Sequence, residues 1–295
     1  MQVSVIMPVY NAAPFLERAI QSALEQPQLA ELIAIDDAST DDSARILENW
    51  AQKTDRLIYL PAISKEPQRA SAARNRGLAV ATAPFIAFLD ADDYYLPGRF
   101  NRTEAYFKAH PEVEGVVEPV EVVYESDLVS QRQRFCKCSC RLNSYEWMLF
   151  SYHDLIAPTL QMNGLTLRRT VLDELDNFDP LLTHAQDLDF GRRMVFNGIN
   201  IKIAGCKMSP IAAYYHHGSN TTNRLQEKWG VSAILEKKWL QLLASEPSTK
   251  SHRAQLFYRY VIFKYQSPPW PRWKKVLLYP ILFSWETIRL IKYLR

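Results

Sequence analysis

Three aspartates crowd into four positions at the end of an apolar run, in the segment IAFLDADDYYLP at residues 86–97. Asp90, Asp92 and Asp93 follow the run IAFL with no basic residue between them. Like charges this close repel one another, so a divalent cation such as Mg²⁺ or Mn²⁺ would relieve them, because hard cations prefer carboxylate and phosphate oxygens. In the alternative interpretation, Asp90 caps the next turn and the other two are solvated loop acids.

The first hundred residues alternate between strand-like and helix-like segments. Continuous apolar runs at 3–10, 31–37, 56–62 and 84–90 predict strands. Amphipathic stretches at 14–26, 39–51 and 71–82 predict helices, and Ser39 or Thr40 is the expected N-cap of the second helix. Apolar strands that alternate with helices predict an α/β fold with a mostly parallel central sheet flanked by helices on both faces.

Polar groups follow three of these strands at their carboxyl ends. In parallel sheets ligands bind in the crevice at that edge. The residues concerned are Pro8, Tyr10 and Asn11 after the first strand, Asp36 and Asp37 after the second, and the three aspartates after the fourth. Carboxylates that converge without basic partners predict a site for a divalent metal and a phosphate-bearing ligand.

The turn after the first strand excludes two kinds of nucleotide site. It reads PVYNAAP, which lacks the G-x-G-x-x-G pattern of dinucleotide-binding folds, and no P-loop pattern occurs in the chain. Because the chain has only 9 glycines, a glycine-rich phosphate cradle is not expected. The metal must therefore neutralise most of the phosphate charge.

Composition indicates a globular protein. The chain has 295 residues, of which 47% are hydrophobic and 23% charged, and its net charge of +3 is too small to argue for nucleic acid. Met1 leads directly into a strand-like run with no basic segment, so we expect no signal peptide and a cytoplasmic location. The cysteines, Cys136, Cys138, Cys140 and Cys206, are then free thiols; zinc at CKCSC is disfavoured, because no CxxC or histidine partner accompanies it.

Four segments occur in an order that resembles the family 2 glycosyltransferases with the GT-A fold. They are VSVIMPVYN, IAIDDASTDDS, ARNRGLAVATAPFIAFLDADD and QDLDFGRRM, and the resemblance covers residues 2–222. It implies a nucleotide-sugar donor, usually a UDP-sugar, a divalent metal (Mn²⁺ or Mg²⁺) and inversion at the anomeric carbon. It also implies a role in cell-surface polysaccharide biosynthesis.

The resemblance also implies roles for residues of the donor site. The nucleotide is expected to contact Pro8, Tyr10, Asn11, Asp37, Arg74 and Asp90. Asp92 completes the D-x-D motif and binds the metal, with Asp93 as a substitute because DADD offers two registers. His217 in YYHHGSNTT is expected at the metal or diphosphate, with His216 as the second choice, while Tyr215 stands where the family often has arginine.

Asp187 is the expected general base by the same resemblance. It opens a predicted helix, whose dipole favours a charged carboxylate, and Gln186 replaces the glutamate usual before it. Without the resemblance, Asp187 would read as a helix cap. Gln186 is expected on the acceptor side, together with Met162, Asn163, Gly164 and Trp147; each of these last four also fits a plain core role.

The predicted organisation is a donor half at 1–110, an acceptor half at 111–222 and a helical, basic and aromatic extension at 223–295. From Ser251 onward the only acid is Glu286, among many lysines, arginines and aromatic residues. The run VLLYPILFSW is shorter than the roughly 20 apolar residues that span a bilayer. We favour attachment to the inner face of the cytoplasmic membrane, near a glycan or lipid-linked acceptor; in the alternative, these aromatics pack on the catalytic domain.

Two other function classes are open. One is a catalytically inactive nucleotide-sugar-binding protein, which the presence of Asp187 disfavours. The other is a sugar-phosphate nucleotidyltransferase, which would need a glycine-rich and basic loop after the first strand; PVYNAAP lacks both features.

Overall fold

The computed structural model describes residues 1–125, 161–182, 185–203, 209–218 and 239. The chain divides into two compact units, one of residues 1–181 with 186–217 and one of residues 182–185 with 218–295. The first unit contains nearly all the described residues, including every described strand. The four cysteines, Trp147 and, apart from Trp239, the predicted C-terminal extension lie outside the described residues.

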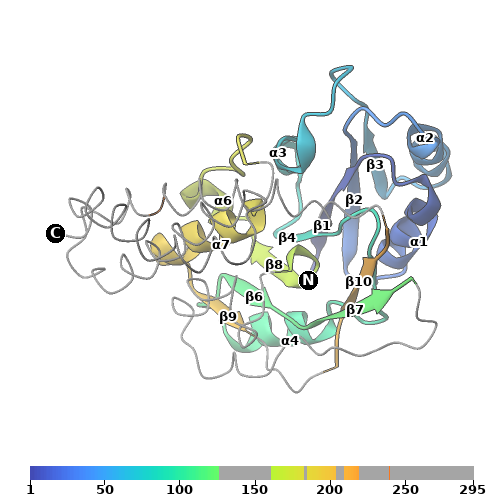
Figure 1. Cartoon of the computed structure of the whole chain (residues 1–295). Helices are drawn as coiled ribbons and strands as arrows, with labels where there is room; N and C mark the ends of the chain where they lie inside the picture. Colours follow the sequence, from blue (N-terminus) through green and yellow to red (C-terminus); the bar gives the residue numbers. More distant parts are fainter. Residues whose placement is uncertain (126–160, 183–184, 204–208, 219–238, 240–295) are drawn as a thin grey trace, which may run out of the picture. The chain divides into compact units, whose positions relative to one another are not determined.

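A seven-stranded sheet forms the centre of the first unit (Figure 1). Its strands lie in the order β3-β2-β1-β4-β8-β6-β9, and all but β8 run in the same direction. Their bounds are β1 Val3–Val9, β2 Leu29–Asp36, β3 Leu57–Leu60, β4 Phe85–Phe88, β6 Gly115–Val117, β8 Leu165–Arg168 and β9 Ile201–Ile203. The predicted α/β class with a mostly parallel sheet is confirmed.

Helices cover both faces of this sheet. On one face α1 (Ala13–Leu24) and α2 (Ser43–Lys53) pack against the alternate β1 residues Val5 and Met7. On the other face α3 (Arg69–Val80), α6 (Val171–Glu174) and α7 (Gln186–Phe196) pack around Ile6 of the same strand. Because β1 is apolar on both sides, it is buried along almost its whole length, as expected for a central parallel strand.

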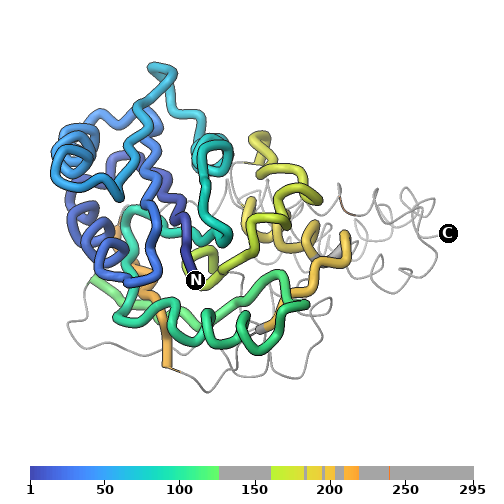
Figure 2. Tube along the Cα trace, turned by 180° about the vertical axis from the view of Figure 1, so that it is seen from behind, coloured from blue at the N-terminus to red at the C-terminus, as the bar shows by residue number. Residues whose placement is uncertain are grey.

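A smaller three-stranded sheet has the order β5-β10-β7. Its strands are β5 (Tyr94–Tyr95), β7 (Val120–Tyr124) and β10 (Ala212–His216). β10 runs parallel to β7 and antiparallel to β5, and the pair β7 and β10 is visible from behind in Figure 2. This sheet brings the YYHH segment beside the DADDYY segment. Two helices connect strands of the small sheet to strands of the large one. Helix α4 (Asn101–Ala109) lies between β5 and β6 in the sequence, and the short helix η2 (Met162–Gly164) precedes β8.

The predicted N-cap of α2 is wrong. The helix begins at Ser43; its N-cap residue Asp42 makes no capping hydrogen bond, and the Ser43 amide donates instead to Asp41 Oδ1 at 2.9 Å. Instead the Ser39 hydroxyl accepts a hydrogen bond from the Asn11 amide at 3.1 Å, and the Thr40 amide donates to the Asn11 side-chain oxygen at 2.7 Å. Ser39 and Thr40 are thus bonded to the loop after β1 rather than to their own helix.

Candidate active site at the carboxyl edge of the sheet

The loops after β1 and β2 leave the sheet side by side, because Val9 pairs with Asp36 at the strand ends. Amides at the start of α1 bond to the neighbouring loop: Ala12 N–H donates to Ser43 Oγ at 2.9 Å and Ala13 N–H to Asp41 Oδ2 at 3.0 Å. Donors that open a helix have no partner within it, so these bonds fix how α1 starts.

Two of the predicted nucleotide contacts differ in exposure. Pro8 is half-buried at the end of β1, whereas the Tyr10 side chain is 50% exposed. Asn11 follows with a positive φ of 49° and uses its side chain to hold the next loop. The exposed ring of Tyr10 is therefore available to stack on a ligand at this edge.

Asp37 is buried and already holds a backbone segment. Its Oδ1 accepts from the Gln68 amide at 2.7 Å and its Oδ2 from the Arg69 amide at 2.6 Å. These bonds stabilise Arg69 at a φ of 75°, where α3 begins. Burial and the charge of Asp36 raise the pKa of Asp37 more than the two amides lower it.

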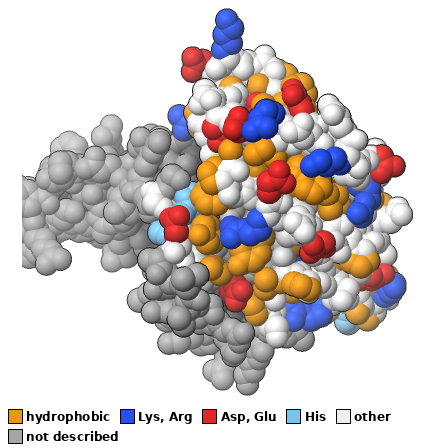
Figure 3. All heavy atoms as spheres, turned by 90° about the vertical axis from the view of Figure 1, so that its right-hand side faces the viewer, with side chains coloured by type: hydrophobic (Ala, Val, Ile, Leu, Met, Phe, Trp, Pro, Cys, Tyr) orange, Lys and Arg blue, Asp and Glu red, His pale blue; other side chains and the backbone are white. Residues whose placement is uncertain are grey.

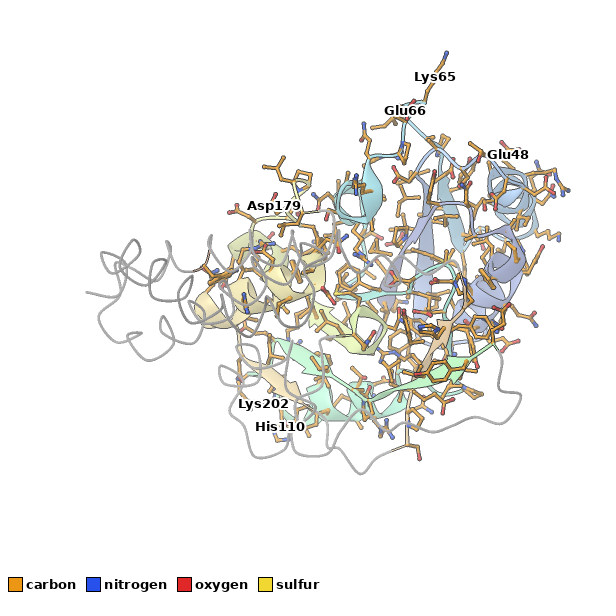
Figure 4. The ribbon with its side chains drawn as sticks, in the orientation of Figure 1. Glu48, Lys65, Glu66, His110, Asp179 and Lys202 are labelled. Atoms are coloured by element: carbon orange, nitrogen blue, oxygen red, sulfur yellow. The ribbon has the colours of Figure 1, made fainter. Side chains whose placement is uncertain are left out.

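The loop between β3 and α3 extends away from the sheet, with Lys65 and Glu66 at its tip (Figure 4). Its far end is the Gln68–Arg69 segment that Asp37 anchors. One carboxylate at the sheet edge therefore fixes the base of a projecting, solvent-exposed loop.

Asp90 has a basic partner that the sequence does not reveal. Arg74 on α3 donates from Nη2 to Asp90 Oδ1 at 2.6 Å, and the Arg74 side chain is almost fully buried. The ring of Phe178 lies 5.5 Å from the guanidinium carbon. The premise that these carboxylates lack basic partners is wrong for Asp90, because α3, which packs over β1 and β2, brings Arg74 to the loop after β4.

Asp92 and His217 face each other, with 3.1 Å between Asp92 Oδ2 and His217 Nε2. Alternation along β10 turns His216 to the opposite side, where its ring lies 5.1 Å from that of Tyr124. Of the two histidines, His217 is the one brought to the aspartate loop. Burial and the charge of Asp90 raise the pKa of Asp92 more than its bond to His217 lowers it.

Asp93 points into the protein and is fully buried. Its Oδ1 accepts from the Tyr215 amide at 2.7 Å, and its Oδ2 accepts from the Asn163 side-chain amide. Burial, with the charges of Asp92 and Asp90, raises the pKa of Asp93 well above its usual value. The carboxylate thus joins η2 and β10 to the aspartate loop, an arrangement that suits structural support.

Asn163 and Gly164 are both buried. The Asn163 side-chain oxygen accepts from the Asp90 amide at 3.1 Å. A side chain at Gly164 would place a Cβ only 2.4 Å from the Glu118 carbonyl oxygen. Met162 is also buried. For these residues the structure favours the core alternative over an acceptor wall.

Beneath Asn163 lies a buried ionic network. Arg99 is fully buried, donates from Nε to the Asn163 carbonyl at 3.1 Å and pairs with Glu118 at 3.3 Å. Arg102 pairs with the other oxygen of Glu118 at 2.9 Å. Because a buried charge is tolerated only when paired, this network fixes η2 in position behind the aspartate loop.

Asp187 is the second residue of α7, and its Oδ1 accepts from the Leu188 amide at 2.8 Å. Burial raises its pKa; the Leu188 amide and the Arg74 charge lower it, the Asp90 charge raises it, and the net shift is upward. The helix dipole, which favours the charged carboxylate and is the only influence visible in the sequence, acts in the opposite direction. The charges of Arg74 and Asp90 therefore reach Asp187, which is half-buried, as is Gln186 before it.

Sequence reasoning missed the roles of two residues of this edge. The sequence offers an acceptor wall or a core position for Asn163, whereas in the structure its side chain bonds to the Asp90 amide and the Asp93 carboxylate. Arg18, on α1, donates to the Asp92 carbonyl at 3.1 Å, a contact that no sequence pattern predicts. A local sequence motif does not predict either contact, because the contacts join segments 73 and 74 positions apart in the sequence.

The donor atoms at this edge fit a hard divalent cation in part. Within the described part of the chain, no group of three or more His, Cys, Asp and Glu side chains is arranged to hold a metal. Asp92 and His217 supply one carboxylate and one imidazole. Such ions bind through one or two carboxylates together with substrate phosphates, so two protein ligands are chemically sufficient for a metal that arrives with a diphosphate.

The surface around α1 and α2 mixes charges of both signs (Figure 3). Blue and red side chains alternate over the described part of this face, without a continuous basic stripe of the kind that nucleic-acid sites show. None of the helices among the described residues has the length and apolarity needed to cross a bilayer.

Comparison with sequences places the chain among glycosyltransferases. The model described as glycosyl transferase family 2 matches residues 4–167. The succinoglycan biosynthesis protein ExoU of Rhizobium meliloti is 41% identical over 100 residues, or 34% of this chain and 29% of ExoU. An uncharacterized glycosyltransferase of Nostoc sp., alr2836, is 34% identical over 182 residues, or 61% of this chain and 55% of that protein. The matched region thus spans only 29% to 55% of these two relatives.

Comparison with solved structures establishes the fold. The S. aureus TarS 1–349 complex with UDP-GlcNAc has a TM-score of 0.68 at 17% identity, covering 100% of this chain and 82% of that one. The mannosyltransferase PcManGT from Pyrobaculum calidifontis, in complex with GDP-Man and Mn²⁺, has a TM-score of 0.59 at 16% identity, covering 99% and 85%. The GT-A fold expected from the sequence is confirmed.

Proposed function

Because the chain belongs to glycosyl transferase family 2, we propose that it is an inverting glycosyltransferase. It moves a sugar from a nucleotide-sugar, of the UDP-sugar type, to a hydroxyl of a glycan or lipid-linked acceptor. The observation that carries the proposal is that the Arg74–Asp90 pair and the Asp92–His217 pair meet on one loop at the sheet edge, where the Arg74 and Asp90 charges act on the Asp187 carboxylate.

The nucleotide lies over the ends of β1 and β2 in this proposal. The exposed Tyr10 ring offers a stacking surface for the base, with Pro8 and Asn11 beside it. Each Asp37 oxygen accepts one backbone amide and keeps a lone pair for a donor on the base. Asp90, fixed by Arg74, accepts from the ribose hydroxyls. A UDP complex of the fold neighbour TarS supports a uridine nucleotide.

A divalent ion, Mn²⁺ or Mg²⁺, would be held by Asp92 and His217, and the buried, hydrogen-bonded Asp93 is assigned a supporting role instead. When bound, such an ion supplies positive charge against the departing diphosphate. The chain's contribution is to hold the Asp92 carboxylate opposite the His217 imidazole and to shield both side chains partly from solvent. Association of Mn²⁺ with GDP-Man in PcManGT supports this assignment.

Asp187 is the general base. Its raised pKa brings the carboxylate closer to the pH at which proton transfer is efficient, while it must be ionised to accept the acceptor's hydroxyl proton. The oxygen attacks the anomeric carbon as the bond to the diphosphate breaks, and the proton ends on Asp187. One base on the face opposite the nucleotide gives a single displacement with inverted configuration.

The acceptor is a cell-surface glycan or its lipid-linked precursor, a proposal supported by the succinoglycan and teichoic acid names of two relatives. Residues 1–110 bind the donor and residues 111–222 shape the acceptor site, with Gln186 beside the base and Trp147 as a wall. The basic and aromatic residues of 223–295 attach the cytoplasmic enzyme to the inner face of the membrane, near such an acceptor.

The test is calorimetric titration of the purified protein with a panel of nucleotide-sugars, with and without Mn²⁺, together with an assay for nucleotide release. We expect metal-dependent binding of one UDP-sugar and slow release of UDP without acceptor. Binding without release in the presence of candidate acceptors would favour an inactive nucleotide-sugar-binding protein. If no nucleotide-sugar binds with any divalent metal, the proposed function is wrong.

A further inference from the structure

Arg18 makes three contacts at the back of the aspartate loop. Its guanidinium carbon lies 4.3 Å from the centre of the Tyr94 ring and 4.3 Å from the centre of the Tyr215 ring. Its Nη2 donates to the main-chain carbonyl of Asp92 at 3.1 Å. An exposed arginine is normally solvated and mobile, so a guanidinium held between two rings and one carbonyl is placed by its surroundings.

Tyr215 connects this arginine to the other half of the proposed metal pair. Its amide donates to Asp93 Oδ1 at 2.7 Å, and its ring lies 5.9 Å from the His217 ring at an interplanar angle of 27°. Phe15, one turn before Arg18 on α1, places its ring 4.3 Å from that of His217. Helix α1 therefore contacts both Asp92 and His217, although they come from separate segments.

We propose that Arg18 is a positioning residue that sets Asp92 opposite His217, through a clamp formed by Tyr94, Arg18 and Tyr215. The hydrogen bond from Arg18 to the Asp92 carbonyl fixes the position of the Asp92 backbone. The contact of Arg18 with the Tyr215 ring fixes the end of β10, which His217 follows. This inference rests on the proposed function, in which that pair binds the metal. Arg18 itself touches neither metal nor donor.

The chemistry of the clamp requires arginine rather than a positive charge alone. A guanidinium is planar, so it stacks on aromatic rings with both faces and still donates hydrogen bonds from its edge. A lysine ammonium cannot occupy the space between two rings and reach the carbonyl with the same geometry. Tyr215→Phe retains the ring and the main-chain amide, whereas Tyr215→Leu removes the stacking surface.

The test measures the Mn²⁺ concentration that gives half-maximal UDP binding, by calorimetry, for Arg18→Met, Arg18→Lys, Tyr215→Phe and Tyr215→Leu. Arg45→Met is the matched control, because Arg45 is an exposed arginine on α2 that pairs only locally with Asp42, at 3.0 Å. We expect Arg18→Met to raise this concentration roughly tenfold, the size of effect that a stacked cation with a hydrogen bond supplies. Arg18→Lys recovers little of the loss.

Further readouts separate positioning from general damage. Tyr215→Phe should need the same Mn²⁺ concentration as the wild type, and Tyr215→Leu the same as Arg18→Met. The double variant with Arg18→Met and Tyr215→Leu should need no more Mn²⁺ than either single variant. The melting temperature of Arg18→Met should stay close to that of Arg45→Met. If Arg18→Met destabilises the chain, Arg18→Lys still reports on the clamp through its Mn²⁺ requirement.

Two results would overturn the assignment while leaving the proposed function intact. An unchanged Mn²⁺ requirement in Arg18→Met would show that the clamp does not act on the metal pair. A loss of UDP affinity that is equal at every Mn²⁺ concentration, including none, would show direct contact with the donor. If instead the wild type binds no UDP at any Mn²⁺ concentration, the proposed function itself is wrong and the assignment falls with it.

Discussion

The carboxylate of Asp187 is subject to opposing influences, and burial is the largest of them. Burial disfavours the charged form, while the Leu188 amide and the Arg74 guanidinium favour it and the charge of Asp90 disfavours it again. The net effect is a pKa above the usual 3.8. For a group that must accept a proton, a raised pKa strengthens the base and also sets the lowest pH at which it is ready.

The first prediction concerns the pH dependence of transfer. A base whose pKa is raised is protonated at a higher pH than an ordinary aspartate, so kcat/KM should fall as pH drops through a value above 3.8. Because the negative charge of Asp90 raises the pKa of Asp187, Asp90→Asn should move this acid limb to lower pH, whatever it does to the rate. Profiles of kcat/KM for the two proteins check this. A limb that moves to higher pH in Asp90→Asn would contradict the assignment of the base.

The second prediction concerns Asn163, which satisfies two buried groups at once, the Asp90 amide and the Asp93 carboxylate. Asn163→Ala leaves both without this partner, and we expect it to lower the free energy of unfolding by about 3 kcal/mol. Asn197→Ala, at an exposed amide that donates to the Arg193 carbonyl, is the control and should cost under about 0.5 kcal/mol. Urea denaturation measures both. Equal losses in the two variants would mean that the asparagine bonds are dispensable.

At the scale of elements, the loops after β1 and β2 form one unit through bonds between side chains and amides. The third prediction is that Ser43→Ala, which removes the buried acceptor of the Ala12 amide, costs about 1–2 kcal/mol. It should also weaken UDP binding, because Tyr10 and Asn11 lie on the same loop. Ser64→Ala, in the exposed loop before α3, is the control. Thermal unfolding and calorimetry provide the readouts, and a Ser43→Ala protein as stable as the control would refute the role.

The fourth prediction concerns the crossing of η2 over the segment that joins β6 to β7. A Cβ at Gly164 would lie 2.4 Å from the Glu118 carbonyl, and a main-chain atom cannot move aside as a flexible side chain can. Gly164→Ala should therefore cost about 3 kcal/mol. Gly198→Asn should cost under about 1 kcal/mol, because the site is open and asparagine tolerates its φ of 78°. Chemical denaturation compares them; a mild Gly164→Ala would mean that the backbone crossing relaxes easily.

The strands and helices of the first hundred residues were predictable because their signals are local. Continuous apolar runs gave β1, β2 and β4, and the acids after them fell at the sheet edge as expected. The N-cap at Ser39 or Thr40 was wrong because a hydroxyl near a helix start bonds equally well to a neighbouring loop. The sequence alone does not reveal whether such a hydroxyl lies closer to the amides of its own helix or to an amide of the neighbouring loop.

Contacts between distant segments were harder to predict. Arg74 reaches Asp90 because α3 packs over β1 and β2, next to β4, and Asn163 supports the aspartates from a segment 73 positions away. The choice between His216 and His217 depends on which face of β10 turns to the aspartate loop. The resemblance to a family named candidate site residues, but their partners depend on tertiary packing.

At the scale of the whole first unit, the edge of the large sheet is completed by the small one. Asp92 follows β4 of the seven-stranded sheet, and His217 follows β10 of the three-stranded sheet, 125 positions later. Asp187 arrives from a third place, the start of α7. Donor binding, metal binding and proton removal would therefore depend on different elements, and each should be separable by mutation.

The most direct test of the proposed mechanism is to measure donor binding and sugar transfer together in Asp187→Asn. The variant keeps the size of the side chain and an acceptor for the Leu188 amide, but it cannot take a proton. We predict that it binds the UDP-sugar with Mn²⁺ within about twofold of wild type, while kcat falls by at least about a hundredfold. Transfer that survives the change would contradict Asp187 as the base, and lost donor binding would contradict the separation of the two functions.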